Sequence, residues 1–276
     1  MAEITAAAVK SLRDKTGLPM MKCKEALQVS GGDEQAAIDW LRKDNIKVQA
    51  SRSGRETAFG RIGLYTDWDK GVGTLVELQC ESAPVAANAE FIALANDLAR
   101  QLATGKGAAS GEELLDQPSP SKSGQTLRDQ LHDLTNRIRE VFKLGRIARL
   151  DGKVAGYVHH AGKTVGVLVE VTGGTPEAAK DIGMHIAASR PQVLSKEDLP
   201  AAEVDKEREI LSEAARNEGK PENIIAKMVE GRLRNFFAER VLLEQPFVKD
   251  DKLTVAKYAQ ANNMKVVRYI YWELGK

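Results

Sequence analysis

The stretch VGTLVEL at residues 72–78 recurs as VGVLVEV at residues 165–171, 93 positions further along the chain. Both copies are rich in branched apolar residues, which is typical of a buried strand. A candidate partner strand precedes each copy (GRIGLYT and GYVHHAG), and a helix of small residues follows each one. A strand–strand–helix unit used twice predicts an α+β fold whose core arose by internal duplication.

The regions around the repeat differ in character and divide the chain into three parts. Residues 4 to about 53 read as three short helices, with Gly17 ending the first, Pro19 opening the second and Asp33 capping the third. The polar stretch KVQASRSGRET that follows is typical of a linker. We therefore expect three domains: a three-helix domain at 1–54, a first core subdomain at 55–150, and a second core subdomain at 151–276.

Helices and strands can also be assigned within the two core subdomains. The first is expected to contain a hairpin of strands at 59–68 and 72–80, then helices from about 85 to 103 and from 126 to about 142. In the second, two helices separated by EGK predict a protruding antiparallel helical hairpin at about 201–243. A helix at 255–262 and the strand KVVRYIYWEL are expected to complete the second sheet.

The composition excludes several classes of protein. The 276 residues carry 40 Lys and Arg against 39 Asp and Glu, so no overall positive charge favours coating of nucleic acid. Cys23 and Cys80 are the only cysteines and lack zinc-site spacing, which indicates reduced thiols in a cytoplasmic protein. No secretory signal and no run of 18 apolar residues occur, so we expect no membrane segment.

No set of residues in the sequence is typical of catalysis. The segment AGKTVG at 161–166 resembles the end of a phosphate-binding loop, but Tyr157 stands where that loop requires glycine. His159 and His160 are neighbours in a predicted strand, face opposite sides and cannot share one metal ion. We expect a binding protein with no catalytic residues, no metal and no cofactor.

Two further features leave alternatives open. The Arg-rich stretch RIREVFKLGRIAR at 137–149 fits a salt-bridged surface better than a nucleic-acid contact, so no direct nucleic-acid partner is expected. Met20 and Met21 fit the apolar face of the second helix. Because adjacent helical residues cannot both point inward, one of them could instead offer an adaptable apolar contact to a partner.

Three stretches carry a family resemblance. VKSLRDKTGLPMMKCKEAL at 9–27 resembles the N-terminal signature of elongation factor Ts, the family of exchange factors for elongation factor Tu. VGVLVEV followed by HIAASRPQVLSKEDLP resembles the repeated core of that family. EGKPENIIAKMVEGRLRNFFAERVLLEQPFVKDDKLTV at 218–255 resembles its helical hairpin, and the match is long and specific.

The resemblance implies a fold, a partner and a set of contact residues. It implies a ubiquitin-associated-type three-helix module, and a protein that binds elongation factor Tu in its GDP or nucleotide-free form and promotes GDP release so that GTP can bind. The apolar stripe of the helical hairpin leaves three arrangements open, packing on its own core, on the partner or on a second copy, so a homodimer formed through the hairpin also fits. The resemblance places the partner-binding residues at Met20, Met21, Glu81, Ser82, Ala83, Pro84, Val85, Ile138, Arg139, His159 and His160.

The sequence departs from the family pattern at two of these places. The family reads Thr-Asp-Phe where this chain has Ser82, Ala83 and Pro84, so a carboxylate and an aromatic side chain are both missing. The family has glycine where this chain has Arg139. These departures keep an alternative open: a paralogue that binds elongation factor Tu or the ribosome as a chaperone or sequestering partner, without exchange activity.

Overall fold

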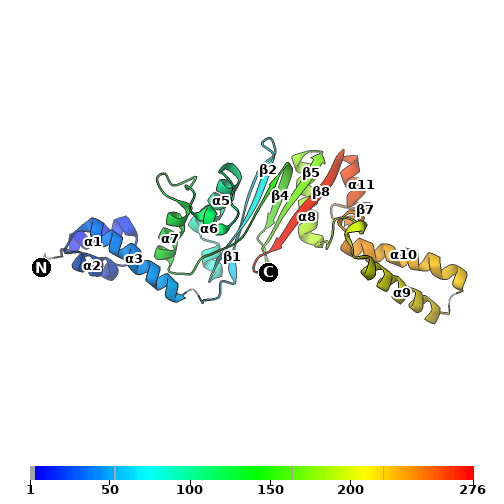
Figure 1. Ribbon diagram of the computed structural model, residues 1–276, viewed down its shortest axis with the longest axis horizontal. Helices are drawn as coiled ribbons and strands as arrows, with labels where there is room; N and C mark the ends of the chain where they lie inside the picture. The colour runs from blue at the N-terminus through cyan, green and yellow to red at the C-terminus, as the bar shows by residue number, and fades with distance from the viewer. Residues whose placement is uncertain (1–3, 53, 163, 220) are drawn as a thin grey trace. The chain divides into compact units, whose positions relative to one another are not determined.

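The computed structural model describes residues 4–52, 54–162, 164–219 and 221–276. Its fold is mixed α+β: three helices come first, followed by antiparallel sheets packed with helices (Figure 1). The chain forms two compact units. One contains Met1–Gly63, Val76–Ala148 and Gly275, and the other contains Leu64–Leu75, Arg149–Leu274 and Lys276.

The N-terminal helices are α1 (Ala6–Thr16), α2 (Met20–Val29) and α3 (Glu34–Arg52). Gly17 ends α1 in the left-handed conformation with a φ of 67°, and Asp33 Oδ1 accepts a hydrogen bond from Ala36 N at 2.7 Å. These helix-ending and capping predictions are confirmed. The linker prediction is wrong over 47–52, because α3 continues to Arg52. The helices share a small core of Val9, Leu12, Leu18, Cys23, Ala26, Leu27, Ala37 and Leu41.

The first sheet has the order β1-β2-β3, so the first copy of the repeat is its central strand. Its strands are β1 (Phe59–Asp67), β2 (Val72–Cys80) and β3 (Lys143–Asp151). The helices between β2 and β3 are α4 (Ala83–Ala86), α5 (Ala89–Thr104), α6 (Gly111–Leu115) and α7 (Leu127–Ile138).

Two helices of this region differ from the sequence prediction. The helix expected from 85 to 103 is divided, because Asn88 Oδ1 accepts hydrogen bonds from Glu90 N at 2.8 Å and Phe91 N at 3.3 Å and so starts a new helix. The helix expected to reach 142 ends at Ile138, because Arg139 turns the chain in the left-handed conformation. The chain from Lys143 to Asp151 then forms a strand that the sequence prediction missed.

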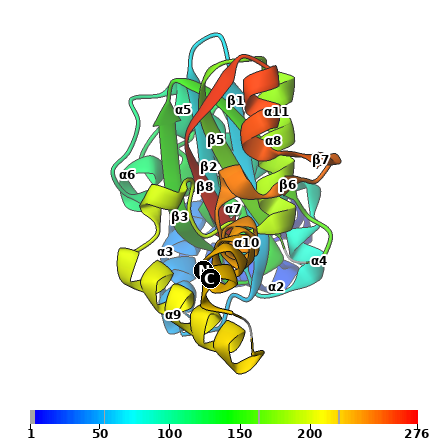
Figure 2. The same ribbon diagram turned by 90° about the vertical axis from the view of Figure 1, so that its right-hand side faces the viewer.

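The second sheet has the order β4-β5-β8, and both strand pairs are antiparallel. The strands are β4 (Lys153–His159), β5 (Val165–Gly173) and β8 (Met264–Glu273), so the second copy of the repeat is again central. The expected last strand is confirmed. Helix α8 (Pro176–Ser189) packs on β4 and β5, and α11 (Val255–Ala261) packs beside β8 (Figure 2).

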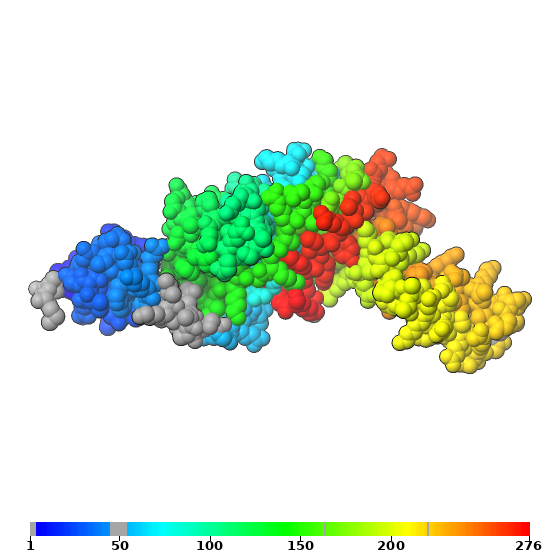
Figure 3. Space-filling view, viewed as in Figure 1, coloured from blue at the N-terminus to red at the C-terminus, as the bar shows by residue number. Residues whose placement is uncertain are grey.

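A pair of long helices, α9 (Ala201–Asn217) and α10 (Glu222–Arg240), is inserted between α8 and β8. The two helices pack against each other around Ala215, Ile225, Val229 and Leu233, and Figure 3 shows them in yellow and orange. The two ends of the insertion form a parallel bridge, Val193 to Val241. The remaining short elements are η1 (Lys196–Asp198), η2 (Leu242–Glu244), β6 (Pro246–Phe247) and β7 (Asp250–Thr254).

Candidate functional site

The tip, residues 81–85, begins the connection from β2 to α5. Ser82 is the N-cap residue of the single-turn helix α4, and Pro84 lies in its first turn. At the end of that helix, the Nε of Arg61 donates a 2.7 Å hydrogen bond to the carbonyl oxygen of Ala86. The exposed residues of the tip are Ala83 and Pro84, and its partly buried residues are Glu81, Ser82 and Val85. The tip therefore presents two small apolar side chains on a turn that is hydrogen-bonded to β1.

Cys80 lies directly before the tip and is fully buried. Burial raises the pKa of its thiol to about 11, and the nearby carboxylates of Glu140 and Glu81 act in the same direction. A hydrogen bond to the carbonyl oxygen of Ser82, 3.3 Å from Sγ, opposes the rise only in part. The thiol therefore stays protonated near neutral pH and packs as a small apolar group.

The turn after α7 contains two of the predicted contact residues. Ile138 ends the helix partly buried, and the exposed Arg139 follows with a φ of 66°. A positive φ favours glycine, which gives a physical reason for the glycine that the family resemblance places here. Glu81 Oε1 accepts a hydrogen bond from Val141 N at 2.7 Å. The structure thus brings this turn and the tip together.

Glu140 is a residue of this site that the sequence prediction missed. Its carboxylate accepts hydrogen bonds from the backbone N–H groups of Glu81 and Ser82, which lie 59 and 58 positions earlier in the chain. A partner so distant in sequence leaves no local pattern. Only the three-dimensional arrangement identifies the contact.

Met20 and Met21 lie in the first turn of α2, and their side chains are 49% and 74% exposed. The placement of both residues on the apolar core face is therefore wrong. That face consists of Cys23, Ala26 and Leu27, which are buried, whereas Met21 lies outside this stripe. Two exposed, adaptable side chains on a rigid helix are suited to an apolar contact with a partner protein.

His159 and His160 lie at the end of β4, in the second unit, and both are exposed. Nδ1 of His159 is 3.3 Å from the hydroxyl of Tyr157, and the two rings stack with centroids 6.4 Å apart. The prediction that both histidines lie in one strand is wrong for His160, because the strand ends at His159.

The Arg-rich stretch 137–149 does not form one surface. It divides between the last turn of α7, the turn after it, and β3. Three of its arginines form ion pairs with nearby carboxylates: Arg137 with Glu90 at 2.6 Å, Arg146 with Glu77 at 2.6 Å, and Arg149 with Asp151 at 2.8 Å. These pairs favour the salt-bridged interpretation over a continuous basic stripe for nucleic acid.

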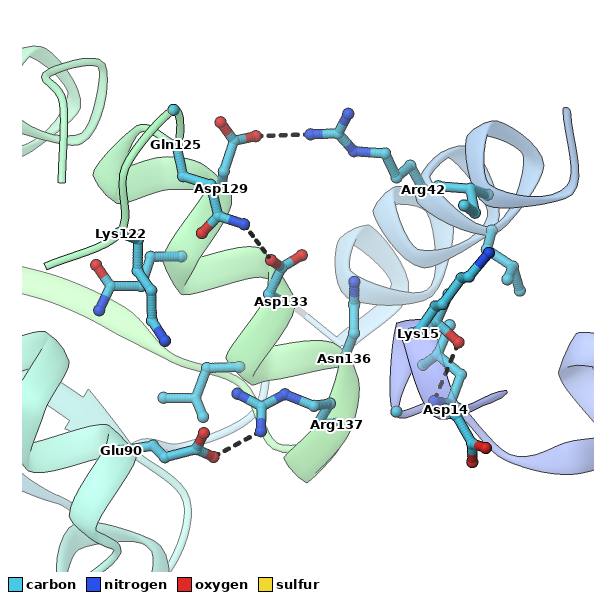
Figure 4. Close-up of a pocket in the computed structure, with 18 of the residues that line it drawn as sticks. Asp14, Lys15, Arg42, Glu90, Lys122, Gln125, Asp129, Asp133, Asn136 and Arg137 are labelled. Carbon is cyan, nitrogen blue, oxygen red and sulfur yellow. Dashed lines mark hydrogen bonds and ion pairs between the residues drawn. The ribbon is translucent and has the colours of Figure 1, made fainter. Parts of the chain in front are cut away.

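A pocket of about 1020 Å³ lies in the first unit, lined by residues of α1, α3, α5 and α7 and by the loop before α7 (Figure 4). Charged and polar side chains along it pair with one another. Arg137 bonds Glu90 at 2.6 Å, Arg42 bonds Asp129 at 2.7 Å, and Gln125 Nε2 is 3.3 Å from Asp133 Oδ2. The opposite charges of the two ion pairs compensate each other, and these groups do not indicate a site for a small ionic ligand.

Among the described residues, no group of three or more His, Cys, Asp or Glu side chains could hold a metal ion. None of the described helices is long and apolar enough to cross a membrane.

Comparison with known proteins places this architecture in a class. The model of a protein family described as "Elongation factor TS" matches residues 81–276, which include the tip, the turn after α7, the second sheet and the helical insertion. The match identifies the class of the chain, the translation elongation factors.

Full-length relatives extend the match to the N-terminal helices. The chain is 41% identical over 276 residues to elongation factor Ts of Methylococcus capsulatus, covering 99% of this chain and 92% of that protein. It is 39% identical to elongation factor Ts of Kineococcus radiotolerans, covering 100% of both chains. The chain belongs to the elongation factor Ts family. Members of this family are nucleotide-exchange factors for elongation factor Tu and act by binding, without enzymatic chemistry.

Proposed function

We propose that this chain binds elongation factor Tu carrying GDP and promotes release of the GDP, so that GTP can bind. The proposal assigns the partner contacts to Met20, Met21, Glu81, Ser82, Ala83, Pro84, Val85, Ile138, Arg139, His159 and His160. The exposure of most of these side chains supports it. No direct contact with nucleic acid is part of the proposal.

The physical requirement is that the chain binds nucleotide-free elongation factor Tu more tightly than the GDP form. Each tenfold weakening of GDP binding requires about 1.4 kcal/mol of differential affinity. By linkage, GDP weakens the binding of the exchange factor to the same extent, so the complex of elongation factor Tu, GDP and this chain is transient. The equilibrium between the GDP-bound and GTP-bound forms of elongation factor Tu is unchanged, and only the rate of reaching it increases.

The single observation that carries the proposal is the tip. Ala83 and Pro84 are exposed on a turn whose preceding residues and final helical turn are hydrogen-bonded to other elements. Such a turn can present a small apolar surface to a partner and loses little conformational entropy when it binds. The family's carboxylate and aromatic side chain are absent here, so the contact would act through the position of the backbone and through Pro84.

The finer features of the fold belong to the same proposal. We infer a ubiquitin-associated-like domain at 1–54 and core subdomains at 55–150 and 151–276 that arose by duplication, with a protruding hairpin at about 201–243. The central position of both repeat copies in three-stranded sheets supports the duplication. As a translation factor, the chain would act in the cytoplasm.

The test is release of fluorescent GDP from the cognate elongation factor Tu. We expect saturating chain to raise the release rate at least tenfold over the spontaneous rate, an effect that corresponds to about 1.4 kcal/mol in the barrier. A rate that stays at the spontaneous value at every concentration would exclude exchange activity. In the control, unlabelled GDP is added without the chain, and the release of fluorescent GDP by simple displacement is measured.

The second candidate function is that of a paralogue, which binds elongation factor Tu or the ribosome as a chaperone or sequestering partner and has no exchange activity. The replacement of the family's Thr-Asp-Phe by Ser82, Ala83 and Pro84 favours it. A tight complex with elongation factor Tu that leaves the dwell time of GDP unchanged would support this function over exchange.

A homodimer through α9 and α10 is a separate part of the proposal. Ile210 and Ile224 are 51% and 44% exposed on these helices, so apolar surface is available there. Sedimentation equilibrium of the chain and of an I210E/I224E variant tests it. A dimer that both proteins form equally would place the interface elsewhere.

A further inference from the structure

The tip and the turn after α7 bind each other through two carboxylates in a reciprocal arrangement. Glu140 Oε2 accepts hydrogen bonds from the backbone N–H of Glu81 at 3.1 Å and of Ser82 at 3.0 Å. In return, Glu81 Oε1 accepts one from Val141 N at 2.7 Å. We call this pair of contacts the carboxylate clasp. Hydrogen bonds to ionised groups are among the strong ones, and here they join segments about 60 positions apart.

The hydroxyl of Ser82 adds a third bond to Glu140. Ser82 is the N-cap residue of α4, where a serine hydroxyl normally accepts from the second or third N–H of the helix. Pro84 occupies the second position and has no N–H. The hydroxyl makes no capping bond and instead donates to Glu140 Oε1 at 2.5 Å. One carboxylate therefore receives three donors from two consecutive residues of the tip.

The backbone after α7 directs Glu140 toward the tip. Arg139 adopts the left-handed conformation with a φ of 66°, which reverses the chain directly before Glu140. Two residues later, the ring of Phe142 meets the fully buried ring of Phe91 edge-on, with centroids 4.9 Å apart. Because Phe91 lies in the first turn of α5, this contact holds the chain that carries Glu140 against the helix that follows the tip.

The clasp also reaches the segment that leads into β1. The guanidinium of Arg55 lies 3.2 Å from Glu81 Oε2, while Oε1 of the same carboxylate binds Val141 N. Glu81 is thus placed by contacts on two sides, and its own N–H is bound by Glu140. The residues before Ala83 are fixed by side chains, and Ala83 and Pro84 themselves remain exposed.

From this geometry we propose that Glu140 is a positioning residue for nucleotide exchange, which holds the tip in one conformation. The inference rests on the proposed function. A tip made of alanine and proline has no long side chain to reach into a partner, so its effect depends on where the backbone stands. A backbone that moved freely would lose conformational entropy on engaging the partner, and that loss would reduce the stabilisation of the nucleotide-free complex.

The experiment measures GDP release from elongation factor Tu at increasing concentrations of each variant, which separates the maximal rate from the half-saturating concentration. We expect E140A to lower the maximal rate about tenfold, as the loss of three charge-assisted hydrogen bonds predicts. The half-saturating concentration should change less than about twofold, because the other contact surfaces are intact. E140Q keeps one acceptor oxygen and should fall between E140A and the natural chain.

Substitutions of Ser82 test the same hydrogen bonds with a smaller expected effect on the maximal rate. S82A should lower the maximal rate of GDP release about threefold through loss of one of the bonds, and S82T, which keeps a hydroxyl donor, should lower it less than S82A does. Amide hydrogen exchange supplies a readout that does not depend on activity. In E140A, exchange should accelerate at Glu81 and Ser82 while β5 keeps its protection.

The matched control is E113Q. Glu113 Oε2 also accepts a backbone hydrogen bond, from Ala109 N at 2.9 Å in the same unit, but away from the tip. E113Q should leave both kinetic parameters unchanged. An unchanged maximal rate in E140A, or unchanged amide exchange at Glu81 and Ser82, would overturn the inference. If the natural chain itself fails to accelerate GDP release, the proposed function fails first; if it accelerates release and E140A does so equally, only the positioning role fails.

Discussion

The two copies of the repeated strand lead into their helices by different connections. At the end of β5, Gly173 and Gly174 turn the chain with φ values of 72° and 71°. Thr175 then caps α8 directly, and its Oγ1 accepts a hydrogen bond from Ala178 N at 3.2 Å. After β2, the tip and the extra helical turn α4 come before α5, and the hydroxyl of Ser82 makes no cap.

The difference shows how a duplicated unit can gain a second role. The β5 connection is short and depends on residues within it, so its chemistry is that of an ordinary strand-to-helix turn. The β2 connection is longer and is held by groups distant in sequence, such as Glu140 and Arg61. We therefore expect substitutions after β5 to affect stability and substitutions after β2 to affect exchange.

The largest effect is expected from G173A. A Cβ at this position would lie 2.2 Å from the carbonyl oxygen of Asn263, and the positive φ adds strain. We expect a loss of about 2 to 4 kcal/mol in the free energy of unfolding. Urea unfolding followed by circular dichroism measures it. The control is G162A, at a φ of +69° with open space around it, which should cost only about 1 kcal/mol.

The next effect is expected from T175A, which removes the cap of α8. Loss of an N-cap hydroxyl costs about 1 kcal/mol, so the free energy of unfolding should fall by that amount. T175S keeps the hydroxyl and should stay close to the natural chain. At a saturating concentration of T175A, the rate of GDP release from elongation factor Tu should be unaffected. A fall in that rate would contradict the division of roles between the two connections.

R139G should stabilise the chain by up to about 1 kcal/mol, because glycine adopts a φ of 66° without the steric cost that a Cβ brings. Differential scanning calorimetry would detect the rise in melting temperature. R139A retains a Cβ and separates the effect of backbone conformation from that of the lost side chain. If R139A and R139G were equally stable, conformational strain at this turn would be excluded as the cause.

The last prediction concerns pH and a buried histidine of the second unit. Val248 N donates to His185 Nδ1 at 3.1 Å, so Nε2 carries the proton and donates to Gln245 Oε1 at 2.8 Å. Burial lowers the pKa of His185 below 6.5, and the Gln245 bond opposes this only in part. As the pH falls through about 6.5, the unfolded chain takes up a proton that the folded chain does not, so stability decreases.

Urea unfolding at pH 7.5 and at pH 5.5 checks this. We expect H185Q to be less stable at pH 7.5 but to show a smaller decrease on acidification. The pKa of His132 is also lowered, mainly by burial and then by the positive charge of Arg128. His132 therefore adds to the decrease in stability on acidification, so H132N is measured in parallel. An H185Q variant with the full decrease of the natural chain would contradict the assignment.

The parts of the fold that were predicted correctly are those with local or repeated signals. The repeat gave both central strands, and the capping residues Gly17 and Asp33 gave the ends of the first helices. The strand β3 was missed because the turn before it uses Arg139, an arginine in a conformation that favours glycine, so the helical pattern continues past its true end.

The candidate site shows the same limit. Family resemblance supplied the tip and the turn after α7 as separate segments, and residue patterns alone supplied neither. The contact between them depends on Glu140, whose partners lie about 60 positions away. Spacing rules describe neighbours in a helix or strand and carry no information on such a contact.

The parallel bridge at the base of the long helices has a consequence for evolution. Val193 and Val241 lie side by side, and Gln192 N and Leu242 N extend the pairing to Arg240 O and Val193 O at 2.8 and 2.9 Å. A segment whose ends are held together can lengthen, shorten or be exchanged while β8 keeps its register, since closing a longer loop adds little entropic cost. The insertion is therefore a place where relatives can differ in length, and where a foreign domain could be grafted, without loss of the sheet.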